Sequence, residues 1–390
     1  MRSSLNFWRG PLLATLCLSL GACSLFGSKD DEDKPAELVE FTTTVKVQKV
    51  WSAKLGGNAE GLRLGLVPAT NGARVFAASS AGEVVAFDAV SGDRVWRKQT
   101  ELPLSGGPGV GRDRIAVGSS EGDLAVLAID SGEMLWQIKI GSEILAAPAL
   151  SVDSVVVRTG DGRLVAFDAQ SGEQQWEIQK IVQGLTLRGN AVPVISGPLV
   201  VAGFDDGTLA AVNLADGNIV WERATSERRG RTEFDRLADV DGRVAVVGED
   251  VFAAGFQGTA ALLSLGSGSP VWRQDLSSHE ALAVDWNRVY ITREDDAVIA
   301  LNRSTGVIMW EQSALSRRGI TGPAVSGSVV AVGDFEGYVH FMDAASGEFV
   351  ARVRVGGGPI VAAPMVVADV VYTLNTDGTL TALRPAQPAP

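Results

Sequence analysis

A fifteen-residue pattern of apolar and polar positions recurs along the chain, as in "GEVVAFDAVSGDRVW", which ends at Trp96. Each copy opens on a glycine (Asp296 in the sixth), continues through an apolar run and a polar turn, and closes on a fixed aromatic position. The later copies close at Trp136, Trp176, Trp221, Trp272, Trp310 and, with alanine in place of tryptophan, Ala351. A second glycine stands four residues before each end: Gly92, Gly132, Gly172, Gly217, Gly268, Gly306 and Gly347. Short β-branched runs between turn residues predict antiparallel strands.

One such module is marginally stable alone, because it exposes apolar surface on both faces of its sheet. Stacking the copies radially buries these faces, with each tryptophan packed between neighbouring blades. An eighth opening, "DGTLTALRP", starts at Asp377 without a closing strand, and "TTVKVQKVW" is a closing strand without an opening that ends at Trp51. Joining the two predicts an all-β fold, an eight-bladed β-propeller with four antiparallel strands per blade, closed by the N-terminal strand. A seven-bladed ring is the alternative, and it leaves one module without a place.

The first residues read as a targeting segment. Arg2 and Arg9 precede "PLLATLCLSL", an apolar run too short to span a bilayer. The run ends in "LGAC", which resembles the lipobox of bacterial lipoproteins, and this resemblance implies cleavage before Cys23 and a covalent lipid on its thiol. Position 24 is Ser rather than Asp, so the resemblance to these lipoproteins implies sorting to the outer membrane. An ordinary secretory signal with an incidental cysteine is the alternative.

These features divide the chain into three parts: a signal peptide at 1–22, a lipidated flexible tether at 23–41 and the propeller at 42–390. The other cysteine, Cys17, lies in the removed segment, so no disulfide is expected in the mature protein. The formal charge of −12 argues against nucleic-acid binding, which depends on Lys and Arg neutralising phosphates.

The module itself resembles a known repeat. The run Ala86, Asp88, Gly92, Trp96 is similar to the repeat of pyrroloquinoline-quinone (PQQ)-type propellers. Together with the lipobox and the length, it resembles the BamB family, lipoprotein propellers of the outer-membrane β-barrel assembly (BAM) complex. The resemblance implies a non-enzymatic scaffold at the periplasmic face of the outer membrane. It implies a BamA-like partner and leaves direct contact with unfolded outer-membrane proteins open.

Two connections between modules are longer than the rest. From tryptophan to the next opening glycine the template counts 26 residues, whereas Trp176 to Gly207 takes 31 and Trp221 to Gly258 takes 37. The stretch from Trp51 to Gly82 also takes 31. Because insertions in repeat proteins project from one face, often the binding face, the two successive insertions predict a docking surface.

The two insertions hold "GLTLRGNAVP" and "TSERRGRTEFDRLADVDG". Both resemble segments with which BamB-family propellers dock on BamA. Residue by residue, this resemblance implies partner contacts by Leu185, Leu187, Arg188, Asp239 and Asp241, with Glu233, Asp235 and Arg236 as matching neighbours. In the alternative interpretation, the two leucines fill the blade core and Arg188 pairs internally with one of the two aspartates.

The rival function is a periplasmic PQQ-dependent dehydrogenase or a small-molecule-binding propeller. Such dehydrogenases often carry a disulfide between adjacent cysteines, and no adjacent pair exists here. Asp88, Asp168 and Asp343 recur at one repeat position, which indicates turn chemistry. The two histidines, His279 and His340, lack metal-ligand neighbours at a workable spacing. No catalytic residue, metal or cofactor is therefore expected, and Trp286, outside the repeat position, is expected to be a core aromatic.

Overall fold

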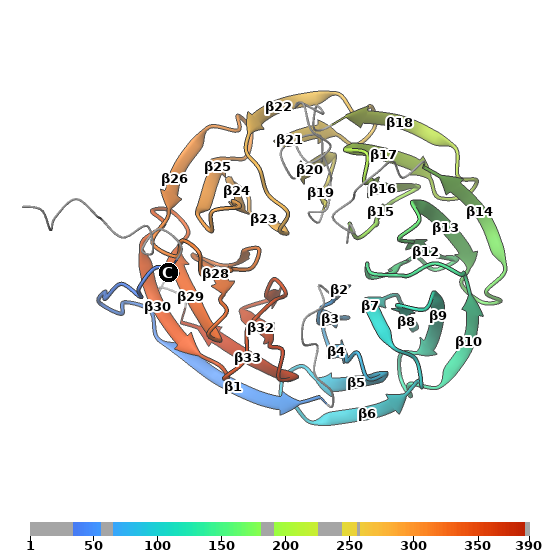
Figure 1. The fold of residues 1–390 in the computed structure, drawn as a ribbon, viewed down its shortest axis with the longest axis horizontal. Helices are drawn as coiled ribbons and strands as arrows, with labels where there is room; N and C mark the ends of the chain where they lie inside the picture. Colours follow the sequence, from blue (N-terminus) through green and yellow to red (C-terminus); the bar gives the residue numbers. More distant parts are fainter. Residues whose placement is uncertain (1–33, 56–64, 181–190, 225–243, 256–257, 387–390) are drawn as a thin grey trace, which may run out of the picture. The chain divides into compact units, whose positions relative to one another are not determined.

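The computed structural model describes residues 34–55, 65–180, 191–224, 244–255 and 258–386, and every regular element in them is a β-strand. Residues 36–390 form one compact unit. Eight sheets are arranged around a ring, and seven of them have four strands (Figure 1). The prediction of an eight-bladed propeller is confirmed.

Each blade is an antiparallel meander that runs from the centre of the ring to its rim. The first strands of the meanders in blades 1 to 8, on the side of the ring's centre, are β3 (Ala69–Thr70), β7 (Leu104–Val110), β11 (Ala149–Leu150), β15 (Val194–Ser196), β19 (Ala245–Val247), β23 (Leu282–Val284), β27 (Ala324–Ser326) and β31 (Met365–Val367). The second strands are β4 (Arg74–Ala78), β8 (Arg114–Ser119), β12 (Ser154–Arg158), β16 (Leu199–Gly203), β20 (Asp250–Ala254), β24 (Arg288–Thr292), β28 (Val329–Gly333) and β32 (Val370–Leu374).

The outer half of each blade carries the repeat. The third strands are β5 (Glu83–Asp88), β9 (Asp123–Ala128), β13 (Arg163–Asp168), β17 (Thr208–Asn213), β21 (Thr259–Ser264), β25 (Val298–Asn302), β29 (Tyr338–Asp343) and β33 (Thr379–Pro385). The outer strands are β6 (Arg94–Gln99), β10 (Met134–Lys139), β14 (Gln174–Gln179), β18 (Ile219–Ala224), β22 (Pro270–Asp275), β26 (Ile308–Gln312), β30 (Phe349–Arg354) and β1 (Val47–Lys54).

Blade 8 is built from both ends of the chain. Its order is β1-β33-β32-β31, and β1 pairs antiparallel with β33, with Val47 opposite Pro385 and Lys54 opposite Thr379. The prediction that the strand ending near Trp51 completes the last blade is confirmed.

Because the strands alternate in direction, each outer strand ends on the face of the ring where the next blade begins. We call this the connector face, and the opposite one the turn face. Connectors on the connector face are held by recurring hydrogen bonds, such as Thr100 N to Gly82 O (2.9 Å) and Ile140 N to Gly122 O (2.7 Å). Each bond ties the start of a connector to the turn between the second and third strands of its own blade.

The tryptophans seal the joints between blades. Each indole Nε1 donates to a backbone carbonyl of the next blade at 2.7–3.1 Å, from Trp51, Trp96, Trp136, Trp176, Trp221, Trp272 and Trp310. Each indole also lies on the second glycine of that next blade. A Cβ added to Gly92 or Gly268, for example, would stand 2.6 Å from the ring of Trp51 or Trp221. The tryptophan and the second glycine, which recur from copy to copy, thus form one contact between neighbouring blades.

A β-bulge directly before each tryptophan aims its side chain into the joint. In blade 1 the register shifts between Ala86 and Phe87, which leaves Val95 without a partner on the neighbouring strand. The same shift occurs in all eight outer pairs. In most blades the bulge side chain points to solvent, which explains several exposed apolar residues of the rim: Val95 (44%), Leu135 (47%), Val220 (49%), Val271 (59%) and Met309 (47%).

The third long connection, between Trp51 and Gly82, contributes to the ring itself. It contains β2 (Gly65–Leu66), which pairs in parallel with β7 and adds a fifth strand to blade 2. Leu66 is buried in the core between blades 1 and 2. The described part of this connection from Gly65 onward is therefore built into the fold.

Trp286 is not a core residue, and that expectation was wrong. It is 89% exposed at the tip of the turn between β23 and β24. The carboxylate of Asp285 accepts hydrogen bonds from Asn287 N (2.7 Å) and Arg288 N (2.6 Å), which fixes a tight turn with residue 286 at its outside.

Candidate functional site

The predicted partner-binding residues lie outside the described part of the chain. Leu185, Leu187 and Arg188 belong to 181–190, and Glu233, Asp235, Arg236, Asp239 and Asp241 belong to 225–243. The predicted lipid acceptor, Cys23, is also outside it. What the structure describes is the framework from which both insertions start and to which they return.

Both insertions start and return on the connector face, in neighbouring blades. The first follows Lys180 at the end of β14 and rejoins at Ala191 before β15; the second follows Ala224 at the end of β18 and rejoins at Val244 before β19. In Figure 1, β14 and β18 are adjacent along the rim. The described ends of both insertions therefore lie on one face of the ring.

An ion pair joins the starting points of the two insertions. Lys180 Nζ bonds Glu222 Oε2, and Glu222 lies on β18 shortly before the second insertion. The two side chains are 18% and 36% exposed, so solvent screens the pair only partly. The geometry links the outer edges of blades 3 and 4 directly.

An aromatic ring beneath this pair carries a second cation. Lys180 Nζ lies 5.6 Å from the centroid of Phe204, and Arg158 Cζ lies 5.7 Å from the same centroid. Arg158 also forms an ion pair with Asp205, and both side chains are almost fully buried. Arg158 comes from blade 3, whereas Phe204 and Asp205 come from the turn after β16 in blade 4. The two blades are therefore fixed to each other at the base of the first insertion.

Sequence reasoning missed this cluster, although a signal was present. Phe204 stands three residues before the turn glycine, where three other blades have Ser79, Ser119 and Thr159. Lys180 likewise stands four residues after its tryptophan, where blade 2 has Ile140. Lys180 is the clearer signal, because the same position holds Leu55, Leu276 and Val355 in other blades and no second charged residue.

The aspartates that recur at one position of the repeat stabilise turns of the fold. The Asp88 carboxylate accepts Val90 N and Ser91 N, and Asp168 and Asp343 hold the equivalent turns. These bonds to backbone N–H groups hold the pKa of Asp88 and of Asp168 below the ordinary value. The prediction of turn chemistry is confirmed.

Asp296 replaces the opening glycine of the sixth copy for a structural reason. It adopts a left-handed φ of 63°, and its carboxylate accepts Gly319 N (2.7 Å) and Ile320 N (3.1 Å) of the next connector. Burial raises its pKa, and the nearby Glu280 adds to the rise. Among the described residues, no group of three or more His, Cys, Asp or Glu side chains is arranged to hold a metal ion.

Comparison with known proteins gives a consistent family. The family model described as "Outer membrane protein assembly factor BamB" matches residues 43–101, 80–312 and 309–387. A protein of that name from Pseudomonas aeruginosa is 45% identical over 375 residues, covering 96% of this chain and 98% of the relative. The crystal structure of BamB from Moraxella catarrhalis aligns with a TM-score of 0.80 at 28% identity, covering 87% of this chain and all of that one.

The rival class shares the architecture alone. Quinohemoprotein alcohol dehydrogenase from Comamonas testosteroni aligns with a TM-score of 0.66 at 14% identity, covering 87% of this chain and 76% of that one. At this level of sequence identity, the similarity shows a shared fold and nothing about function. The described part of the chain holds no helix long and apolar enough to cross a membrane.

Proposed function

Because the chain belongs to the BamB family of outer membrane protein assembly factors, we propose that it docks on a BamA-like partner through its two inserted connectors. The protein is a non-enzymatic assembly factor of the outer-membrane β-barrel assembly complex. The finer proposal concerns which surface it uses, where it is anchored and what it holds.

The docking surface is the pair of insertions at 181–190 and 225–243. The observation that carries the proposal is their common framework: both are rooted on the connector face in adjacent blades, and the Lys180–Glu222 ion pair joins their starting points. Two connectors held side by side present a composite surface, with Leu185 and Leu187 as apolar contacts. Arg188 offers a planar five-donor fork to backbone carbonyls or carboxylates of the partner. Asp239 and Asp241 supply acceptors beside it.

The anchor is a lipid on Cys23, which places the propeller at the periplasmic face of the outer membrane. In this position the ring acts as a rigid scaffold, holding the partner's periplasmic domains while β-barrel proteins are inserted. The only covalent group it requires is the lipid.

The test is a charge or polarity change in the first insertion. Leu187→Asp and Arg188→Glu are expected to leave the thermal midpoint unchanged and to reduce recovery of BamA in co-purification at least about tenfold, since one central contact of this kind contributes about 1.4 kcal/mol or more. Arg112→Glu, the same change at an exposed position on the turn face, is the matched control and should co-purify normally. Unchanged recovery with folded Leu187→Asp and Arg188→Glu would place the docking surface elsewhere.

A further inference from the structure

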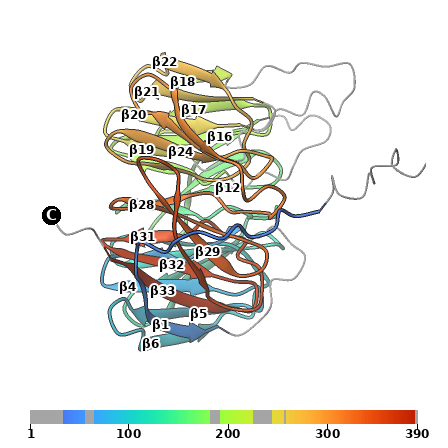
Figure 2. The same cartoon turned by 90° about the vertical axis from the view of Figure 1, so that its left-hand side faces the viewer.

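The segment before β1, residues 36–46, lies along the outer edge of blade 7, and we call it the strap. It crosses the height of the ring before the chain turns back into β1 (Figure 2). At its start, Ala36 N donates to Ser316 O (2.9 Å), in the connector between blades 6 and 7. Near its end, Thr44 N and Val45 N both donate to Val350 O (3.0 and 3.1 Å). The strap thus enters on the connector face and descends along β30.

The strap covers the β-bulge of β30, whereas the equivalent bulge side chain of blade 5 is exposed to solvent. Val350 is the bulge residue of β30, and it is 9% exposed, whereas the equivalent Val271 of blade 5 is 59% exposed. Phe41 of the strap lies 5.6 Å from Phe349, centroid to centroid. The rim of blade 7 is therefore a binding site for an extended segment, and this chain supplies the segment itself.

Two arginines hold the strap by its backbone. Arg318 Nη1 donates to Ala36 O (3.0 Å), and Arg352 Nη1 donates to Val39 O (3.1 Å). The guanidinium of Arg352 also lies 5.1 Å from the ring centroid of Phe41. A guanidinium offers several donors in a rigid fork, so each arginine can hold a strap carbonyl and still bond an internal partner.

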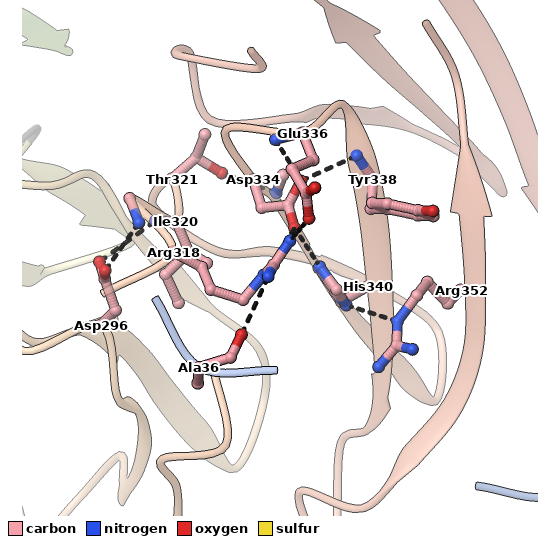
Figure 3. A network of polar contacts seen from close by, with 12 residues as sticks. Ala36, Asp296, Arg318, Ile320, Thr321, Asp334, Glu336, Tyr338, His340 and Arg352 are labelled. Atoms are coloured by element: carbon pink, nitrogen blue, oxygen red, sulfur yellow. Dashed lines mark hydrogen bonds and ion pairs between the residues drawn. The ribbon is translucent and has the colours of Figure 1, made fainter. Parts of the chain in front are cut away.

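The internal partners are a buried aspartate and a buried histidine (Figure 3). Asp334 Oδ2 accepts Arg318 Nε (3.0 Å) and Nη2 (2.7 Å) and lies 3.0 Å from His340 Nε2. His340 Nδ1 in turn accepts Arg352 Nε (3.1 Å), so its Nε2 carries the proton and donates to Asp334. Asp334 and His340 are both fully buried. One carboxylate thus aims both arginines, Arg318 directly and Arg352 through the imidazole.

Burying a charged carboxylate costs free energy, and apolar packing does not offset this cost. Burial acts to raise the pKa of Asp334, but hydrogen bonds from His340, Tyr338 N and Arg318 outweigh it and hold the pKa below its ordinary value. Asp334 therefore stays charged inside the ring. Since a buried charge is retained only with well-placed partners, the two arginines are held in fixed orientations, in which Nη1 of each donates to a carbonyl of the strap.

We propose that the strap is a built-in clamp that sets where the lipid leash leaves the propeller. The proposal rests on the lipid at Cys23. With the strap bound, the leash consists of residues 24–35, twelve residues, and with the strap released it extends to residue 46, twenty-three residues. At about 3.5 Å per extended residue, its maximal reach is about 40 Å when clamped and about 80 Å when free. The clamp therefore keeps the connector face, with its docking surface, close to the membrane.

The experiment uses the lipidated protein purified from membranes and bound to vesicles of phosphatidylethanolamine and phosphatidylglycerol (3:1). A donor dye on Glu121→Cys, an exposed position on the connector face, reports its distance from acceptor-labelled lipid. In Arg318→Gln/Arg352→Gln we expect hydrogen exchange at Thr44 and Val45 to rise about tenfold or more, and energy transfer to fall. Arg354→Gln is the matched control, because this exposed arginine of β30 stacks on Tyr338 instead.

A second variant keeps the buried network intact. Phe41→Ser removes the contacts with Arg352 and Phe349 from the strap side, and it should also speed exchange and reduce energy transfer. Faster exchange without a change in transfer would overturn the leash proposal, and slow exchange in both variants would overturn the clamp. If the unsubstituted protein fails to bind vesicles, the lipidation proposal fails, and the leash proposal fails with it. Exchange measured in solution still decides the clamp in that case.

Discussion

Seven of the eight joints between blades are built alike, and the joint between blades 7 and 8 differs. In the regular joints, a tryptophan lies on a glycine of the next blade and donates to its backbone. At the different joint, Ala351 stands in the tryptophan position. It packs in a hydrophobic cluster that includes Val45 of the strap and Val47 of β1.

The difference follows from how the ring is closed. The glycine under each tryptophan belongs to the turn between the third and outer strands of the next blade. In blade 8 these strands are β33 and β1, which come from opposite ends of the chain, so no such turn connects them. Without this glycine, blade 8 offers no surface against which an indole could pack, and the small side chain of Ala351 fits at this joint. The joint that lacks a tryptophan is flanked by the strap and the Arg318–Asp334–His340–Arg352 network.

The largest expected effect comes from breaking a regular joint. Trp221→Ala should lower the free energy of unfolding by about 3–5 kcal/mol, because it leaves a cavity above Gly268 and frees the carbonyl of Leu265. Denaturant unfolding followed by circular dichroism measures this. Trp286→Ala, at an exposed turn outside the joints, should change the free energy of unfolding by less than about 0.5 kcal/mol. Equal effects of the two substitutions would contradict this account of the joints.

A smaller effect is expected from making the different joint resemble the others. Ala351→Trp should destabilise the protein by about 1–3 kcal/mol, since residue 351 is 2% exposed and has no glycine beneath it. The same unfolding measurement applies, with Ala351→Val as a milder step in the same direction. A gain in stability for Ala351→Trp would show that the joint had room for an indole.

The smallest effect is a pH dependence confined to the different joint. Burial lowers the pKa of His340 below its ordinary value; the charges of Arg352 and Arg318 act in the same direction, and Asp334 opposes them. The unfolded chain then takes up this proton at a higher pH than the folded one. Stability from this site is complete above the ordinary pKa of about 6.5 and is lost as pH falls below it.

Unfolding at pH 7.5 and 5.5 measures this loss. His340→Gln should flatten the dependence, and His279→Gln, the same change at the other histidine, should not. The pKa of Asp334 is also lowered, but its window lies below about pH 4 and does not overlap this measurement. An unchanged slope in His340→Gln would contradict the assignment to this network.

The repeated part of the fold could be predicted from the sequence because its signal is periodic. Each of the seven second glycines stands four residues before its closing position, and counting the closing positions from Trp51 to Ala351 is enough to place eight blades and the closing strand. The two insertions were identified in the same way, as departures from the count, and their docking role stays a prediction.

Features that depend on neighbours in space could not be found in this way. Lys180 and Glu222 are 42 positions apart and meet only because blades 3 and 4 are adjacent. The strap carries no repeat signature, and its stretch 36–41 falls in the range that the sequence assigns to the tether. Trp286 has the composition of a core residue, but the bonds of Asp285 to the backbone place it at the tip of a turn.

The pairing of β1 with β33 also orders events in time. The hydroxyls of Ser52 and Thr381 lie 3.2 Å apart although 329 positions separate them in the chain. A polypeptide that crosses a membrane from its N-terminus delivers β1 first and β33 last, so blade 8 cannot assemble until translocation is nearly finished. A contact of such long range also closes slowly. If the chain is exported from its N-terminus, as its proposed signal peptide implies, the ring remains an open chain of blades until β33 arrives.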